Sequence, residues 1–111
     1  NIGIEIRDSK LVSDLFGISA REKTIAEGVS IRIESYFARD TVNLPTILNV
    51  VADIGEHVAL PIAVGILSRC LYDKLKDRKT SKVTINHMQV EINADKIETL
   101  ILEILKREEK E

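Results

Sequence analysis

Apolar and polar residues alternate at the start of the chain. Residues 2–7 place Ile2, Ile4 and Ile6 at every second position, with small or charged residues between them. A period of two with β-branched residues is typical of a strand that has one buried face. The alternation returns over residues 29–37 and predicts a second strand. If these strands are neighbours, a right-handed crossover joins them and they run parallel.

Two short helices are expected between these strands. Residues 11–16 carry apolar side chains at helical spacing, and Gly17 can end that helix. Ser19 and Glu22 match a capping box, which predicts a second short helix ending near Gly28.

The middle of the chain is predicted to be helical. Apolar residues recur at helical spacing after Pro45, which predicts a helix over residues 46–57. Pro61 would remove a backbone donor and clash with the preceding turn. Either a second helix follows over residues 61–78, or one long helix is kinked near Leu60.

A β-hairpin is expected next, with strands over residues 83–86 and 88–92 and a two-residue turn at Asn86 and His87. Such a turn puts four apolar residues on one face: Val83, Ile85, Met88 and Val90. Asn93 or Asp95 can cap a last helix, whose apolar stripe is Ile97, Leu100, Ile101, Ile104 and Leu105. Residues 106–111 are expected to form a solvated, fraying tail.

Together these elements predict a single α+β domain over residues 1–111. It is a two-layer sandwich with a mixed sheet of about four strands, in the order β-α-β-α-α-β-β-α. The helices are expected to pack on one face of the sheet. The expected sheet contains the hairpin and the first strand.

Composition narrows the function. The chain has 16 Ile, 11 Leu and 9 Val but four aromatic residues and no Trp, which argues against stacking platforms for bases or sugars. A net charge of −2 argues against a dedicated nucleic-acid binder. The glycines are isolated, so no phosphate loop and no cofactor are expected. Cys70 is the one cysteine and cannot form an internal disulfide, which favours a reducing cytoplasm. Because it lies in an apolar segment, we expect its thiol to be buried and inert.

The most apolar stretch, residues 58–72, contains Ser68 and Arg69 and is too short to span a bilayer. No signal peptide is recognised at Asn1. We therefore interpret residues 60–72 as a buried helix that is apolar nearly all round and needs cover on more than one side. A second copy of the chain could supply that cover. The expected interaction residues are Leu60, Ile62, Ala63, Gly65, Ile66 and Leu67.

The leading hypothesis is therefore a non-catalytic protein-interaction module that self-associates as a homo-oligomer or docks to an effector protein. An alternative is a small metal-binding protein or enzyme. Asp53 and His57 lie four residues apart and, with Glu56, could share a helix face, although a metal needs more ligands and His87 lies elsewhere. The ordinary interpretation of this cluster is a solvated stripe.

A second alternative is a nucleic-acid accessory protein. Residues 69–82 carry six basic and two acidic side chains and could contact phosphates. Basic residues also stabilise the C-terminal end of a helix, because they complement its macrodipole. This second explanation makes nucleic acid an unexpected partner.

Residues 46–105 carry an apolar helix that closes in an aromatic and basic run over residues 71–76, then a hairpin over residues 83–92 and an amphipathic helix. In this order of elements the chain resembles small α+β effector-associated domains, which occur beside proteases and NTPases in prokaryotic conflict and signalling systems. Tyr72 stands where a Trp is more usual, and the hairpin has no Gly. The resemblance implies an adaptor-like module and supplies no functional residues.

Overall fold

The structure is a computed structural model that describes residues 2–8, 22–37, 46–78 and 82–109. Within these residues the chain is α+β, with six strands and two helices. In chain order they are β1 (Ile2–Asp8), β2 (Glu22–Ala26), β3 (Val29–Phe37), β4 (Thr46–Ile54), α1 (Leu60–Leu75), β5 (Lys82–Ile85), β6 (Met88–Val90) and α2 (Ala94–Glu109). The predicted helix over residues 11–16 lies outside the described part of the chain.

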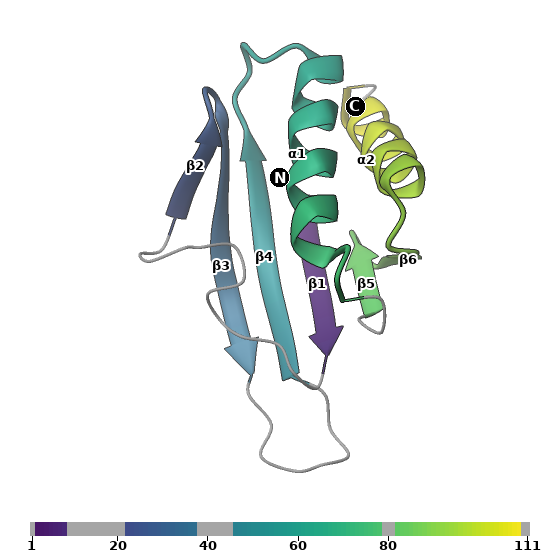
Figure 1. Ribbon diagram of the computed structural model, residues 1–111. Coiled ribbons are helices and arrows are strands. Elements are labelled where there is room, and N and C mark those ends of the chain that lie inside the picture. Colours follow the sequence, from purple (N-terminus) through teal and green to yellow (C-terminus); the bar gives the residue numbers. More distant parts are fainter. Residues whose placement is uncertain (1, 9–21, 38–45, 79–81, 110–111) are drawn as a thin grey trace.

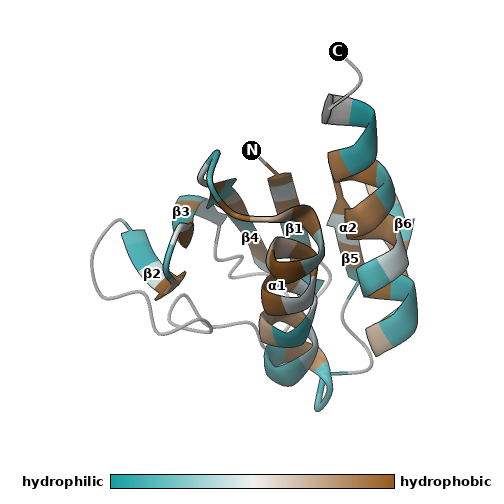
Figure 2. Ribbon diagram, turned by 90° about the horizontal axis from the view of Figure 1, so that it is seen from above, coloured by the Kyte–Doolittle hydropathy of each residue, from teal (hydrophilic) through white to brown (hydrophobic). Residues whose placement is uncertain are grey.

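The strands form one antiparallel sheet in the order β2-β3-β4-β1-β5-β6. Figure 1 shows α1 and α2 side by side with opposite directions, and the view from above in Figure 2 places both on the same face of the sheet. The core lies between the two layers. Its largest fully buried side chains come from both layers: Ile2, Ile6, Leu48, Leu67, Leu75, Ile85, Ile97 and Ile101.

The first two predicted strands are β1 and β3, and they are not neighbours, so the parallel pair expected if they were neighbours does not form. β4 lies between β1 and β3 and pairs with both of them in antiparallel fashion. Among the described residues the sheet therefore has six strands and is antiparallel, whereas the sequence predicts a mixed sheet of about four strands. The helix predicted to end near Gly28 is also wrong, because residues 22–26 form β2 and make a hairpin with β3. Gly28 has a φ of +79°, which suits this tight turn.

The helix predicted over residues 46–57 is strand β4 as far as Ile54. β4 is a central strand with apolar residues on both faces, so its sequence shows no clear period of two. On its outer face Val51 is only 7% exposed, and its partner in the register with β3 is Arg32. A long Arg stem can cover an apolar neighbour while its charged end stays in water.

α1 is one helix that begins at Leu60 and ends at Leu75, so the second predicted helix is confirmed with a shorter C-terminal end. Pro61 occupies the first turn, where the missing backbone N–H has no partner within the helix in any case. The alternative of one helix that continues through a kink near Leu60 is therefore wrong, since the residues before α1 form β4 and a turn.

The hairpin is confirmed in position and register: Val83 pairs with Val90, and Ile85 with Met88. Asn86 and His87 form the turn, with φ values of +48° and +69°. Positive φ at both central residues is the requirement of a type I′ turn, whose twist matches the flanking strands.

The last helix is also confirmed. The Asn93 side-chain oxygen accepts hydrogen bonds from the backbone N–H groups of Asp95 at 3.0 Å and Lys96 at 3.1 Å, so Asn93 caps α2. Ile97, Ile101, Ile104 and Leu105 of the predicted stripe are buried. The helix continues to Glu109, so residues 106–109 of the predicted fraying tail are helical.

Candidate functional site

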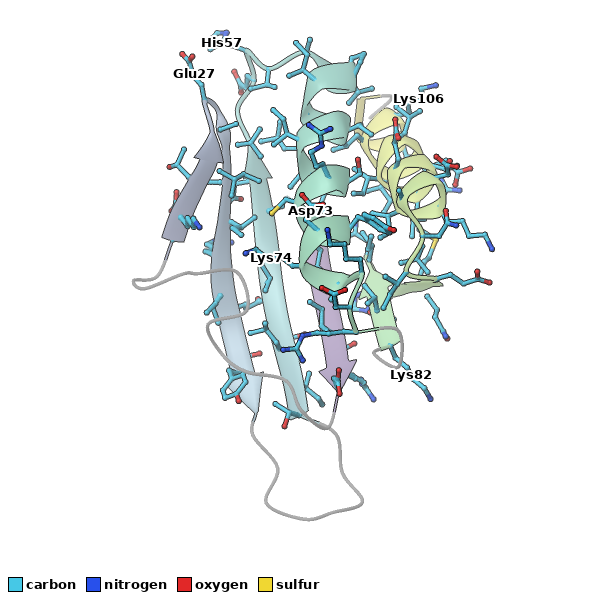
Figure 3. All side chains as sticks on the ribbon, viewed as in Figure 1. Glu27, His57, Asp73, Lys74, Lys82 and Lys106 are labelled. Atoms are coloured by element: carbon cyan, nitrogen blue, oxygen red, sulfur yellow. The ribbon has the colours of Figure 1, made fainter. Side chains whose placement is uncertain are left out.

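The proposed metal ligands are not brought together on a helix. Asp53 lies on the outer face of β4, while Glu56 and His57 are exposed in the turn that follows it. Figure 3 shows His57 at the end of the molecule, beside the β2–β3 turn that carries Glu27. The Asp53 carboxylate receives a hydrogen bond from Arg32 Nε at 3.2 Å. The described residues contain no group of three His, Cys, Asp or Glu side chains that could hold a metal ion.

The basic residues of the 69–82 segment are spread over different surfaces. In Figure 3 Lys74 lies on α1, whereas Lys82 lies at the far end of β5. Arg78 Nη1 lies 3.8 Å from the Asp8 carboxylate at the end of β1, so its charge is used within the fold. The cluster that the sequence suggests is therefore not a continuous phosphate-binding surface in the described part of this segment.

The six expected interaction residues divide between the core and the surface. Ala63 and Leu67 are 0% and 1% exposed, because they face the sheet and are covered by the chain itself. Leu60 and Ile66 are half-buried against the core. Ile62 and Gly65 face away from the sheet, and Ile62 is 58% exposed. The part of α1 that another molecule could contact is therefore the strip that contains Ile62 and Gly65.

This strip lines a shallow groove of about 680 Å³ between the outward side of α1 and the first turns of α2. We call it the α1 groove. Most of its lining comes from α1: Pro61, Ile62, Gly65, Ile66, Ser68, Arg69, Tyr72 and Asp73. Ala94 and Glu98 of α2 complete it. No local pattern in the sequence identifies these two residues, because they belong to the groove only through the packing of α2 beside α1.

Gly65 contributes open space to the α1 groove. A Cβ built at this position has no heavy atom within 4 Å beyond its own helix and chain neighbours, so nothing in the described structure requires a glycine there. Glycine in the middle of a helix costs roughly 0.5–1 kcal/mol relative to alanine. Gly65 therefore lowers the stability of α1, and no contact within the described fold explains why a glycine occupies this position.

The charges of the α1 groove are of both signs. Arg69 is its cation, and Asp73 and Glu98 are its carboxylates; all three are exposed. Ser68 is buried at one side, and its hydroxyl donates to the carbonyl of Gly65 at 3.3 Å. The arrangement offers an apolar strip with polar and charged sides, which is the usual composition of a protein-contact surface.

Cys70 lies outside the lining of the α1 groove and is half-buried. Burial raises the pKa of its thiol, an effect that Lys74 and Lys23 oppose and Asp73 reinforces. A raised pKa leaves little thiolate at neutral pH, and the thiolate is the reactive form. Cys70 is thus half-buried rather than fully buried as expected, and its low reactivity stays a prediction.

The outer face of the sheet carries polar side chains that bond to one another. Glu5 accepts from Arg7 Nη2 at 2.9 Å and from the Thr84 hydroxyl at 3.4 Å. On the neighbouring strands, Asn49 Nδ2 donates to the Ser35 hydroxyl at 2.7 Å. An antiparallel sheet commonly has one such solvated face opposite its packed face.

Comparison with protein-family models, curated proteins and solved structures finds no match to this chain. The helices of the described residues are also too short or too polar to cross a membrane.

Proposed function

We propose that this protein is a cytoplasmic, non-catalytic interaction module that works by self-association through the α1 groove. The observation that supports this most is the combination of Ile62, exposed to 58%, with Gly65, a helix-interior glycine above which there is open space. A second helix can approach most closely where a side chain is missing, so a position that weakens the isolated chain strengthens an interface.

The groove is self-complementary. In a symmetric dimer each copy presents the same patch, so that patch must contain both partners of every contact. Two antiparallel α1 helices related by an axis near Leu67 would place Arg69 of each copy over Gly65 of the other. The same arrangement sets Ile62 against Tyr72, which is half-buried. Carboxylates and a cation occur on the same patch, so like charges need not meet.

The dimer is expected to be weak. One pair of helices buries less than the area of a standard protein interface, about 800 Å² per partner. The fraction of dimer therefore depends on the concentration of the protein. This behaviour suits an adaptor that assembles when several copies are brought close together. Docking of an effector on the same groove is the second candidate, and the resemblance to effector-associated domains of prokaryotes favours it.

Sedimentation equilibrium over a wide range of protein concentration tests self-association. Wild-type protein should show a monomer–dimer equilibrium. Ile62→Gln and Gly65→Gln should each weaken it at least about tenfold, corresponding to a loss of roughly 1.4 kcal/mol at the contact. Glu103→Gln, an exposed substitution on the other flank of α2, is the matched control and should leave the equilibrium unchanged.

A wild-type protein that is strictly monomeric at millimolar concentration would rule out self-association. A dimer that survives both groove substitutions would move the interface to another surface. Both variants should remain folded, because Ile62 is mostly exposed and the Gly65 position has free space.

A further inference from the structure

β6 is the edge strand of the sheet among the described residues, and its backbone has a defined free side. Across the two-residue turn Ile85 is opposite Met88, the next pair is Thr84 and Gln89, and Val83 is opposite Val90. The two residues that flank a two-residue turn form a hydrogen-bonded pair. On the other side of β5, the Asn86 N–H bonds to the Gly3 carbonyl. Hydrogen-bonded pairs alternate along antiparallel strands. The N–H and C=O groups of Gln89 therefore point away from β5, toward the open edge.

A second groove, of about 290 Å³, runs along this edge between β6 and α2. We call it the β6 groove. Its apolar part consists of Val90 on β6 and Leu100 on α2, both half-buried. It lies on the flank of α2 opposite to Glu98, so it is separate from the α1 groove. An added strand would thus find backbone groups at the edge and an apolar site beside them.

The charge of the β6 groove is acidic. Its one lysine, Lys96, is bound to Glu91 with Nζ and Oε2 2.7 Å apart. Asp95 and Glu103 are the carboxylates of the lining, and both are exposed. The net field therefore favours a basic side chain on whatever occupies the groove.

We propose that the β6 groove binds an extended peptide segment of a partner protein as a seventh, antiparallel strand. The residue opposite Gln89 would exchange both backbone hydrogen bonds with it, as in other cases of strand addition to a sheet edge. Side chains on either side of that residue would point toward α2. One of these peptide side chains is apolar and packs between Val90 and Leu100 of the groove. A Lys or Arg of the peptide, two residues further along, lies near Glu103. This site does not depend on self-association through α1.

A blocked seven-residue peptide is a suitable probe, with threonine at odd positions and valine, valine and lysine at positions 2, 4 and 6. Titration into ¹⁵N-labelled protein should shift the amides of β6 and of residues 95–103, and it should move the Gln89 amide in the direction of a new hydrogen bond. N-methylation of the threonines removes the donors that face β6 and should weaken binding roughly tenfold or more. N-methylation of the valines should not.

Gln89→Pro gives the matched test in the protein. Proline removes an N–H that points to solvent, a position where an edge strand tolerates it, and should abolish binding. Gln89→Ala keeps the N–H and should bind as wild type. If the proline variant does not fold, the pair of N-methylated peptides still decides.

Several outcomes would overturn the proposal. Shifts confined to α1, binding that is insensitive to threonine methylation, or no binding at millimolar peptide would each exclude strand addition at β6. A Gln89 amide that becomes protected as the protein alone is concentrated would instead assign the edge to a second copy. Replacement of the peptide's lysine by glutamate should weaken binding several-fold, and an unchanged affinity would contradict the assigned charge preference.

Discussion

Asn86 performs two tasks in the hairpin, and substitutions can separate them. As the first central residue of the turn it has a φ of +48°. Its backbone N–H bonds to the Gly3 carbonyl at 2.8 Å, and its side-chain oxygen accepts from the Gly3 N–H, also at 2.8 Å. In a regular ladder the backbone carbonyl of residue 86 would accept that second bond. The side chain therefore replaces a carbonyl that the turn directs elsewhere.

The expected losses follow from these two tasks. Asn86→Gly keeps the backbone conformation but leaves the part-buried Gly3 N–H without its acceptor, at a cost of about 1–2 kcal/mol. Asn86→Ala loses the same acceptor, and alanine tolerates the left-handed region less well than asparagine, which adds up to about 1 kcal/mol. Asn86→Asp keeps an oxygen acceptor and a residue that tolerates positive φ, so it should stay within about 0.5 kcal/mol of wild type.

His87→Gly is the control. His87 is exposed and has a φ of +69°, and glycine removes the strain of that conformation. The variant has an Asn-Gly turn and should be more stable by about 0.5–1 kcal/mol. Two glycine substitutions at adjacent turn residues are thus expected to act in opposite directions.

Urea unfolding measures these changes. With a slope of about 1.5 kcal/mol per molar, Asn86→Gly should lower the midpoint by roughly 1 M. Hydrogen exchange of the Gly3 amide should accelerate in Asn86→Gly and stay slow in Asn86→Asp. If Asn86→Asp is as unstable as Asn86→Gly, or if both glycine variants change stability alike, the replacement of the backbone carbonyl by the side chain is refuted.

Three further predictions concern Gly28, Gly65 and Cys70. Gly28→Ala should cost more than about 2 kcal/mol in urea unfolding, because the backbone there has a positive φ that a Cβ disfavours and because the Cβ would overlap the Val58 side chain; a loss below about 0.5 kcal/mol would contradict this. Gly65→Ala should raise the free energy of unfolding of the monomer by about 0.5–1 kcal/mol, and a destabilised monomer would mean that the fold itself needs the glycine. Cys70 should react with iodoacetamide more slowly in the native than in the unfolded protein, since burial raises the pKa of its thiol. The folded state then holds this proton more tightly, so this group's contribution should lower stability as the pH rises through the range in which the unfolded thiol ionises.

Local signals predicted the C-terminal half of the chain correctly. The hairpin register follows from a two-residue turn and from apolar residues at fixed offsets, which both require Val83 opposite Val90. The last helix follows from a cap at Asn93 and a stripe at helical spacing. In each case the partners are close in the sequence, so few alternative pairings compete.

β4 shows why the N-terminal half was predicted less well. A strand that pairs on both edges, and is apolar on both faces, loses the alternation that identifies a strand. Ile47 and Val51 point to the outer face and yet fit a helical spacing with Val50 and Ile54. Because β4 pairs with both β1 and β3, missing it removed the strand that separates them, and missing β2 as well lowered the expected number of strands from six to about four.

The candidate interaction residues on α1 were expected from its apolar sequence, but which of them are exposed could not be predicted, because exposure depends on contacts with distant segments. An apolar helix signals that several sides are covered, but it does not say which sides the chain itself covers. Packing decided that Ala63 and Leu67 face the core and that Ile62 and Gly65 face outward. The metal hypothesis depended on Asp53 and His57 sharing a helix face, and the strand with its following turn separates them.

By itself the sequence determined the α+β class, the hairpin, the capped last helix and a middle helix with more apolar residues than one sheet needs. These depend on spacing and on turn and cap chemistry, which act between near neighbours. Only the tertiary structure decided the strand order, the two grooves beside α2 and the position of Gln89 on the strand that forms the sheet edge among the described residues. These arise where segments distant in the sequence meet, because contacts between layers depend on register and helix orientation rather than on local preference.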